Sequence, residues 1–341
     1  MSNVTRTPLT ATSVSTILSM DGGVMRLPRC PATSEELRAA GFKPQRLAPW
    51  FRAPSYFDQL SLFAAGSSPT VIVGGAGTGK DTAAKAYAAI TGRPFYSIGL
   101  SESTDLSSAL LEMSIEDGDT VKRLGPLARA AKGLTIQRGG REMVIPSVIL
   151  ISDFDRANPR TLEAFRNAFE APEGWFAMPD GSVLEVAAGT TFILTSNSGV
   201  DGDGGSGMIS EAIDASIANR LNWISTPHPS EEWMAEVVTA AHPSITPAQA
   251  TTLVKAMDAL KAVCEQLQLP FGVSIRDALR WAEHISILMG AGLSFEEGIK
   301  RCVAGSVEAT RDEANTNALW GAVDPFVGSK IPNDGNIVDS F

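Results

Sequence analysis

The stretch TVIVGGAGTGKDTAAKAYAAIT (residues 70–91) decides the fold of this chain. Four apolar residues are followed by a glycine-rich run and then by a helical pattern of small residues. Glycines in such a run let backbone N–H groups close around phosphate oxygens, and a lysine at the start of the helix reaches the terminal phosphates. The order strand, loop, helix therefore predicts a phosphate-binding loop for ATP. Its residues are Gly74, Gly75, Ala76, Gly77, Thr78, Gly79, Lys80, Asp81 and Thr82.

Apolar and helical segments alternate around this loop, as they do in parallel α/β sheets. Strands are expected at 70–73, 94–99, 148–152, 191–195 and 223–225. Past Pro229 only helical patterns follow, at 231–241, 247–268, 274–290 and 294–305. The pattern predicts an α/β core with a parallel sheet between helices, followed by a C-terminal helical subdomain.

The chain is expected to divide into four parts. A leader at 1–60 contains a hairpin (15–28) and short helices, and the nucleotide-binding core covers 61–228. A helical lid covers 229–310, and a tail at 311–341, rich in Asn, Gly, Pro and Asp, is expected to pack loosely or to extend to a neighbour. Within the core, apolar segments around polar turns predict hairpins at 111–124, 134–147 and 175–186.

Composition narrows the class of protein. The 341 residues are 44% hydrophobic and 19% charged, and no apolar run approaches the roughly 18 residues of a membrane span. The N-terminal sequence lacks the apolar core of a signal peptide, so we expect a cytoplasmic protein that does not enter a membrane. The net charge of −10 argues against a broad nucleic-acid-binding surface. The three cysteines lie far apart without zinc-site spacing, and we expect buried, reduced thiols.

Two positions depart from the usual form of such a nucleotide site. The residue after the lysine is usually Ser or Thr, whose hydroxyl binds Mg²⁺, but here it is Asp81. The strand VILIS (148–152) should end in an acidic metal ligand, but it ends in Ser152, and Asp153 follows. A carboxylate and a hydroxyl have exchanged places, so Mg²⁺ would still meet one of each. We predict that Asp81 and Ser152 form a swapped Mg²⁺ pair and that Asp153 is the catalytic base.

Two other interpretations stay open from the sequence. Asp153 could itself bind the metal ion with Phe154 in the base position, which would leave a protein that binds ATP but hydrolyses it poorly. Asp81 could instead repel phosphate and inactivate the site. Asp153 is also one methylene shorter than Glu, so turnover could be slow even if it is the base.

Several further motifs occur in a fixed order. They are LSESTDLSSALL (100–111), GPLARAAKG (125–133), SDFDRANPRTLEAFRNAFE (152–170), TTFILTSNSGVDGDGGSGM (190–208) and SIANRL (216–221). Together with the phosphate-binding loop, they resemble the MoxR branch of AAA+ ATPases over about 50–305. Within that branch the chain is most similar to the cobaltochelatase ATPase subunit (CobS-like) and its phage-encoded relatives.

The resemblance implies roles for three more residues. Asn197 matches the sensor that polarises the attacking water, and Arg220 matches the arginine finger that reaches the γ-phosphate in a neighbouring subunit. Arg276, in VSIRDAL, matches the second sensor on the lid. Each supplies a donor or cation for developing phosphoryl charge. Considered without the resemblance, Asn197 could be a strand-end cap, and the two arginines could be ordinary surface residues at helix ends.

The resemblance also implies a mode of action. Such proteins form rings, typically hexamers, and use ATP hydrolysis with Mg²⁺ to remodel a protein partner, and relatives work with a separate von Willebrand A-type protein. The hairpins at 111–124 and 175–186 would face the pore or a partner. The hairpin at 134–147 has no counterpart in the family, so it is either a specific contact or a surface insertion.

Two classes of function stay in competition after this comparison. An alternative to the motor is a nucleotide-gated scaffold that binds ATP but hydrolyses it slowly or not at all. A nucleic-acid translocase is disfavoured by the acidic balance and by the lack of an aromatic and basic stripe. A small-molecule kinase is disfavoured because it would need no finger from a second subunit.

Overall fold

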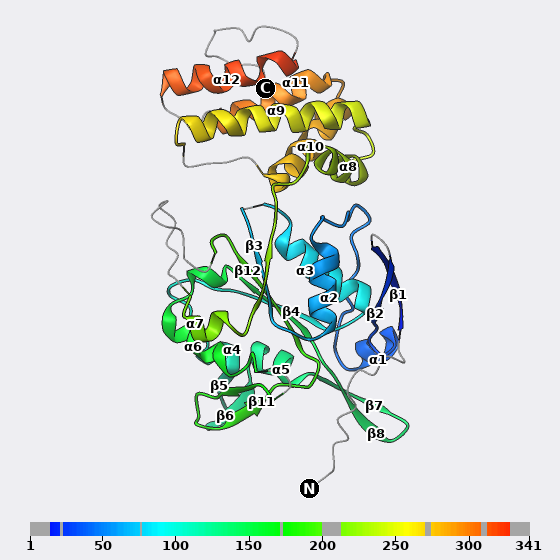
Figure 1. Cartoon of the computed structure of the whole chain (residues 1–341), viewed down its shortest axis with the longest axis vertical. Helices are drawn as coiled ribbons and strands as arrows, with labels where there is room; N and C mark the ends of the chain where they lie inside the picture. Colours follow the sequence, from blue (N-terminus) through cyan, green and yellow to red (C-terminus); the bar gives the residue numbers. More distant parts are fainter. Residues whose placement is uncertain are drawn as a thin grey trace. The chain divides into compact units, whose positions relative to one another are not determined.

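The computed structural model (Figure 1) describes residues 14–20, 23–75, 77–170, 173–199, 213–269, 274–307 and 312–327. The chain divides into two compact units. The first consists of Met1–Ala48 and Ala53–His228, and the second of Pro49–Arg52 and Pro229–Phe341. The expected leader boundary at residue 60 falls inside helix α2 (Phe57–Ala65), which packs against the sheet of the first unit.

Five parallel strands form the sheet of the first unit, in the order β13-β3-β12-β9-β4. Each strand end lies within one residue of its predicted position, which confirms the α/β core. The strands are β3 (Thr70–Val73), β4 (Phe95–Gly99), β9 (Val148–Ser152), β12 (Thr191–Ser196) and β13 (Asn222–Ser225). The central strands β9 and β12 are buried nearly throughout because helices cover both faces of the sheet.

The helices of the first unit form two layers, one on each face of the sheet (Figure 1). Helices α2 and α3 contact the central strands on one face. The apolar residues of α5, α6 and α7 share a core with alternate strand residues such as Ile149, Ile151 and Leu194 on the other face. Besides α2, the helices of these layers are α3 (Lys80–Thr91), α4 (Ser107–Leu110), α5 (Pro126–Lys132), α6 (Pro159–Arg166) and α7 (Ala215–Ala218).

A buried arginine ties together the loops at the amino ends of these strands. Arg93 is 1% exposed, and its guanidinium donates to Pro146 O at 3.2 Å, to Ser147 O at 2.8 Å and to Thr191 Oγ1 at 2.8 Å. A further bond reaches Gly189 O at 2.5 Å. Burial lowers the pKa of Arg93. The cation is therefore held by carbonyl and hydroxyl oxygens, which fix the positions where β4, β9 and β12 begin.

Four antiparallel strand pairs occupy the segments where hairpins were expected. They are β1 (Val14–Met20) with β2 (Gly23–Pro28), β5 (Leu111–Glu116) with β6 (Asp119–Leu124), β7 (Leu134–Arg138) with β8 (Arg141–Ile145), and β10 (Trp175–Ala177) with β11 (Val183–Glu185).

The β7–β8 hairpin makes a specific contact within the chain. Its Arg138 donates from Nε to Oε1 of Glu36 at 2.7 Å and from Nη2 to the second carboxylate oxygen, and it also donates to Pro31 O at 2.9 Å. Glu36 belongs to the short helix α1 (Ser34–Ala39), where it closes a capping box with Thr33. The β7–β8 hairpin therefore attaches the leader to the core.

The second unit is a bundle of helices around its own apolar core. Its helices are α8 (Glu231–Ala241), α9 (Pro247–Gln266), α10 (Ile275–Gly290), α11 (Phe295–Val307) and α12 (Glu313–Val327). The first four confirm the predicted helical region. In the described part of the chain, every helix is too short or too polar to cross a membrane.

Helix α12 corrects the prediction of a loosely packed tail from residue 311. Leu319, Val323 and Val327 recur every fourth residue, so they form one apolar stripe, and all three are buried in the core of the second unit. Asn, Asp and Pro residues elsewhere on the helix hid this stripe in the sequence. The rest of the expected tail, 328–341, lies outside the described residues.

Candidate active site

The glycine-rich loop after β3 has a backbone that other residues could not adopt without strain. Gly77 and Gly79 have φ values of 76° and 81°, in the left-handed region that favours glycine. Gly74 faces Thr226, and a Cβ atom at position 74 would lie 1.8 Å from Thr226 Oγ1. The loop therefore keeps the open, glycine-dependent form that a phosphate cradle needs. Ala76 lies outside the described residues.

The lysine that opens α3 is buried in this loop. Lys80 is 8% exposed, and its Nζ donates to Gly74 O at 2.6 Å, to Gly75 O at 2.8 Å and to Asn197 Oδ1 at 3.1 Å. Burial lowers the pKa of Lys80, while the nearby carboxylates oppose that shift. The ammonium group is therefore positioned at the mouth of the loop, where phosphate oxygens could replace the carbonyls.

Asp81 and Ser152, the two exchanged residues, are in direct contact. Ser152 Oγ donates to Asp81 Oδ2 at 3.0 Å, and Thr195 Oγ1 donates to Asp81 Oδ1 at 3.1 Å. The carboxylate at the start of α3 is thus held between the ends of β9 and β12, and each of its oxygens accepts a hydroxyl. Thr195 was not predicted as a site residue, although a hydroxyl directly after the apolar run Phe-Ile-Leu was a signal of a specific partner.

Asp153 lies just beyond β9 and contacts the predicted sensor. Its backbone is left-handed, with φ 54° and ψ 44°, which is uncommon for a residue with a side chain. Asn197 Nδ2 donates to Asp153 Oδ1 at 3.2 Å. Since Asn197 also accepts from Lys80, one amide group joins the lysine of the loop to the predicted base.

Asp155 positions this sensor and was also missed. It is 3% exposed, and its Oδ2 accepts from the backbone N–H groups of Asn197 at 3.1 Å and of Ser198 at 2.9 Å. The Ser198 hydroxyl donates to the same oxygen at 2.6 Å. The other oxygen, Oδ1, is buried and accepts no hydrogen bond from the described residues. Its position in the Asp-Arg-Ala motif gave no indication of this contact.

The remaining loop residues are held by their own network. Thr78 is buried; its Oγ1 donates to Gly75 O at 3.1 Å, and Tyr56 Oη donates to Thr78 O at 3.3 Å. Burial raises the pKa of Tyr56, and Asp81 adds to that rise. Thr82 is half-buried in the first turn of α3. The sequence gave no indication that Tyr56, in the leader, supports the loop.

The donor set fits a nucleotide with Mg²⁺. Among the described residues, no three His, Cys, Asp or Glu side chains gather as ligands of a metal ion. One carboxylate with two hydroxyl groups beside a phosphate cradle suits Mg²⁺, which takes few protein ligands and shares the rest with phosphates and water. Asp81 and Ser152, the predicted ligands, are hydrogen-bonded to each other, and Thr195 bonds to the other oxygen of Asp81, so their role as metal ligands stays a prediction.

The two predicted arginines lie in different units. Arg220 follows α7 in the first unit, and its guanidinium pairs with Glu170, with Nε donating to Oε1 at 2.6 Å. Arg276 lies in the first turn of α10 in the second unit, and its side chain is exposed. Within the described part of the first unit, Arg220 bonds to Glu170 and Ser216 and not to the loop. The roles of both arginines stay predictions.

Comparison with known proteins bears on the first unit. Residues 69–213 match the family model described as the AAA domain of the dynein-related subfamily. None of the curated proteins matches the chain.

Two solved structures, both mutants of Thermotoga maritima RuvB, are similar to the chain. One has a TM-score of 0.47 at 12% identity and covers 77% of this chain and 72% of its own. The other has a TM-score of 0.43 at 14% identity, with coverages of 85% and 77%. The matched segment, 69–213, holds four of the five sheet strands and the glycine-rich loop. It is therefore an AAA domain with the P-loop nucleotide-binding fold.

Proposed function

We propose that this chain is an ATPase of the MoxR type, close to the cobaltochelatase subunit, which assembles into a ring and uses ATP hydrolysis to remodel a protein partner. One observation carries the proposal: Asn197 links Lys80 of the phosphate loop to Asp153 at the end of β9. Cation, amide and carboxylate then meet where a terminal phosphate and its attacking water belong.

Each residue has a task that follows from its contacts. Lys80 exchanges its carbonyl partners for phosphate oxygens, and the loop N–H groups bind the remaining oxygens. Asp81 and Ser152 hold Mg²⁺, which supplies neutralising charge when bound. Asp153 accepts a proton from the attacking water at a carboxylate oxygen. Asn197, whose backbone is fixed by Asp155, orients that water.

The swapped metal pair is supported by the contact between its members. Ser152 and Asp81 lie within hydrogen-bonding distance, so a carboxylate and a hydroxyl face one position although their places in the sequence are reversed. Repulsion of phosphate by Asp81 is reduced because two hydroxyls and the N-terminus of α3 stabilise the charge.

Ring assembly would complete the site. Arg220 is proposed as the finger that enters the site of a neighbouring copy, and Arg276 as the second sensor. The partner protein is proposed to be of the von Willebrand A type, by resemblance to the MoxR branch.

A second function, a nucleotide-gated scaffold, is favoured by the state of Asp153. Its carboxylate is shorter than that of Glu and is already engaged by Asn197, with Arg156 at 4.0 Å. With its base held in this way, the protein would hydrolyse ATP slowly. It would then use bound ATP to stabilise an assembly. Phosphate release from the purified protein separates this function from the motor.

The experiment that tests the site is an exchange of its two unusual residues. Asp81→Ser and Ser152→Asp are made singly and together, and we measure ATP affinity with and without Mg²⁺ and phosphate release. We expect each single change to weaken Mg²⁺-dependent binding and the double change to restore much of it, because one carboxylate and one hydroxyl are present again. Additive losses in the double variant would show that the two residues do not share a metal ion.

A further inference from the structure

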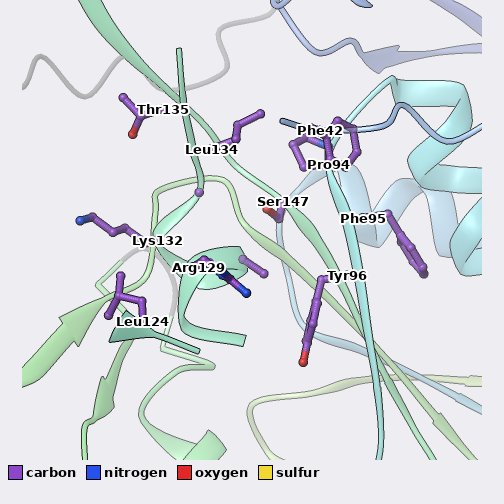
Figure 2. Close-up of a pocket in the computed structure, with 12 residues that line it drawn as sticks. Phe42, Pro94, Phe95, Tyr96, Leu124, Arg129, Lys132, Leu134, Thr135 and Ser147 are labelled. Carbon is purple, nitrogen blue, oxygen red and sulfur yellow. The ribbon is translucent and has the colours of Figure 1, made fainter. Parts of the chain in front are cut away.

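A second hollow of the first unit lies away from the nucleotide site. It has a volume of about 320 Å³ and is lined at the amino ends of β4 and β9, by Pro94, Phe95, Tyr96 and Ser147. All strands of the sheet are parallel, and the phosphate loop follows the carboxyl end of β3. The hollow, at the amino ends of β4 and β9, therefore lies at the opposite end of the strands. Figure 2 shows the lining side chains.

The walls of this hollow come from several segments of the first unit. Phe42 follows α1, outside the matched residues 69–213, whereas Leu134 and Thr135 begin the β7–β8 hairpin, inside them. The pair between Arg138 and Glu36 holds these two segments together.

The lining is positive in an acidic molecule. It contains Arg129 and Lys132, both on the exposed side of α5, and no Asp or Glu, although the chain has a net charge of −10. Within the described residues, neither cation forms an ion pair. Arg129 lies close enough to Tyr96 to oppose the rise in pKa that burial gives this tyrosine. Two cations therefore stand beside aromatic and aliphatic side chains without a carboxylate to balance them.

The strand beside the hollow has an open edge. β4 is the last strand of the described sheet, and Ser97 and Gly99 on it are exposed. The backbone N–H and C=O groups on its outer side pair with no described strand, which is the arrangement that extended peptides use when they add to a sheet.

We propose that this edge docks an extended, acidic segment of a partner protein. The segment lies along β4, its carboxylates meet Arg129 and Lys132, and an apolar side chain enters the hollow beside Tyr96 and Leu134. Charge complementarity selects this occupant: a nucleic acid would need a longer row of cations than these two. The docking surface goes beyond the proposed ATPase site, because it needs no nucleotide and its hollow lies at the amino ends of the strands, away from the phosphate loop.

The test measures the binding of a short fluorescein-labelled peptide of alternating Glu and Val to the full chain by fluorescence anisotropy. We expect binding, and we expect Arg129→Glu with Lys132→Glu to weaken it about tenfold or more. Lys85→Glu with Lys255→Glu is the matched control, because both of these lysines are exposed and the net charge changes equally. A peptide of alternating Glu and Pro, which lacks half of the N–H groups needed along a strand, is expected to bind more weakly.

Four results of the binding measurements above would overturn the proposal, in addition to the Tyr96→Ala result given below. They are the absence of binding by the Glu–Val peptide, equal binding of a Lys–Val peptide, equal loss in the control variant, and tighter binding of a labelled oligo-dT. A Tyr96→Ala variant gives a second measurement within the hollow: weaker peptide binding supports the proposal, and unchanged binding contradicts it. Thermal unfolding of each variant shows that the fold is kept.

Discussion

Asp81 is held by two hydroxyl groups from neighbouring strands, and this arrangement explains the polar residue Thr195 near the carboxyl end of β12. Thr195 is 3% exposed within a strand that is buried along its whole length. A buried hydroxyl without a partner costs free energy, so Thr is tolerated here because it donates to Asp81. Ser152 holds the other oxygen, and the two donors together fix the direction of the carboxylate.

Thr195→Val should therefore destabilise the first unit and misplace Asp81. Val has nearly the same shape but no hydroxyl, so one charged, half-buried oxygen loses its donor. We expect a loss of about 1–3 kcal/mol in the free energy of unfolding, measured by urea denaturation, together with weaker Mg²⁺-dependent ATP binding. Thr195→Ser is the matched control and should stay near the parent protein. Equal values for Val and Ser would show that the hydroxyl has no role.

Gly74 gives a prediction that needs no nucleotide. A Cβ at this position would lie 1.8 Å from Thr226 Oγ1, so Gly74→Ala must displace the loop or the segment after β13. We expect a loss of stability of about 2 kcal/mol or more in thermal or chemical unfolding. Thr226→Ala removes the clashing oxygen and should recover part of the loss. At Gly75 a Cβ meets nothing within 4 Å, so Gly75→Ala is the control and should change stability little.

At the scale of elements, the apolar patterns were sufficient to predict the sheet. The five strands could be located because each is short, apolar and bounded by Gly, Pro or polar residues. Polar turns such as Glu116–Asp119 marked the hairpins, since left-handed residues concentrate there, Asp117 and Gly118 among them. Within the candidate site, the exchange of a carboxylate and a hydroxyl between two motif positions predicted that Asp81 and Ser152 lie together, and the two are hydrogen-bonded.

Contacts between elements that are distant in sequence could not be predicted in the same way. Arg93 donates a hydrogen bond to Thr191, and Tyr56 donates one to Thr78. Nothing in a single sequence indicates that these residues are neighbours. Asp155 looks like any acidic residue of a helix entry, yet it fixes Asn197. Helix α12 was missed because its apolar stripe is narrow and is diluted by Asn, Asp and Pro on the other faces.

The contact between α1 and the β7–β8 hairpin predicts a dependence on pH. The hydrogen bonds from Arg138 lower the pKa of Glu36 from 4.5 to about 2. Because this pKa is depressed, the ionised carboxylate of Glu36 stabilises the contact fully above about pH 4.5. This stabilisation is lost as the pH falls through about 2. We expect the protection of the α1 amide groups against hydrogen exchange, relative to the intrinsic exchange rate at each pH, to fall over that range.

Glu36→Gln is the control for this prediction. Its side chain does not titrate, so exchange in α1 should be faster than in the parent at neutral pH, and the difference should close as the pH approaches 2. A constant difference between the two proteins across this range would mean that the ion pair does not hold the leader.

At the scale of the whole molecule, the proposed role of Arg220 depends on assembly. In the single chain its guanidinium is engaged by Glu170 and by the carbonyl of Ser216. A finger that acts on a neighbouring copy must leave these partners, so the ion pair with Glu170 is a competing state of the same side chain. Assembly would therefore have to offer Arg220 a stronger negative charge than one exposed carboxylate, and a bound polyphosphate is such a charge.

A mixing experiment tests whether this arginine acts across copies. Arg220→Ala should keep ATP binding but lower phosphate release by roughly 10³-fold if it removes a finger. Asp153→Ala should also bind ATP without hydrolysing it, because the base is absent. In a mixture of the two variants, some interfaces join an intact Asp153 to an intact Arg220, so activity should exceed the sum of the separate proteins. Activity that stays at that sum while the mixture co-assembles, as shown by mass photometry, would mean that Arg220 does not serve a neighbouring site.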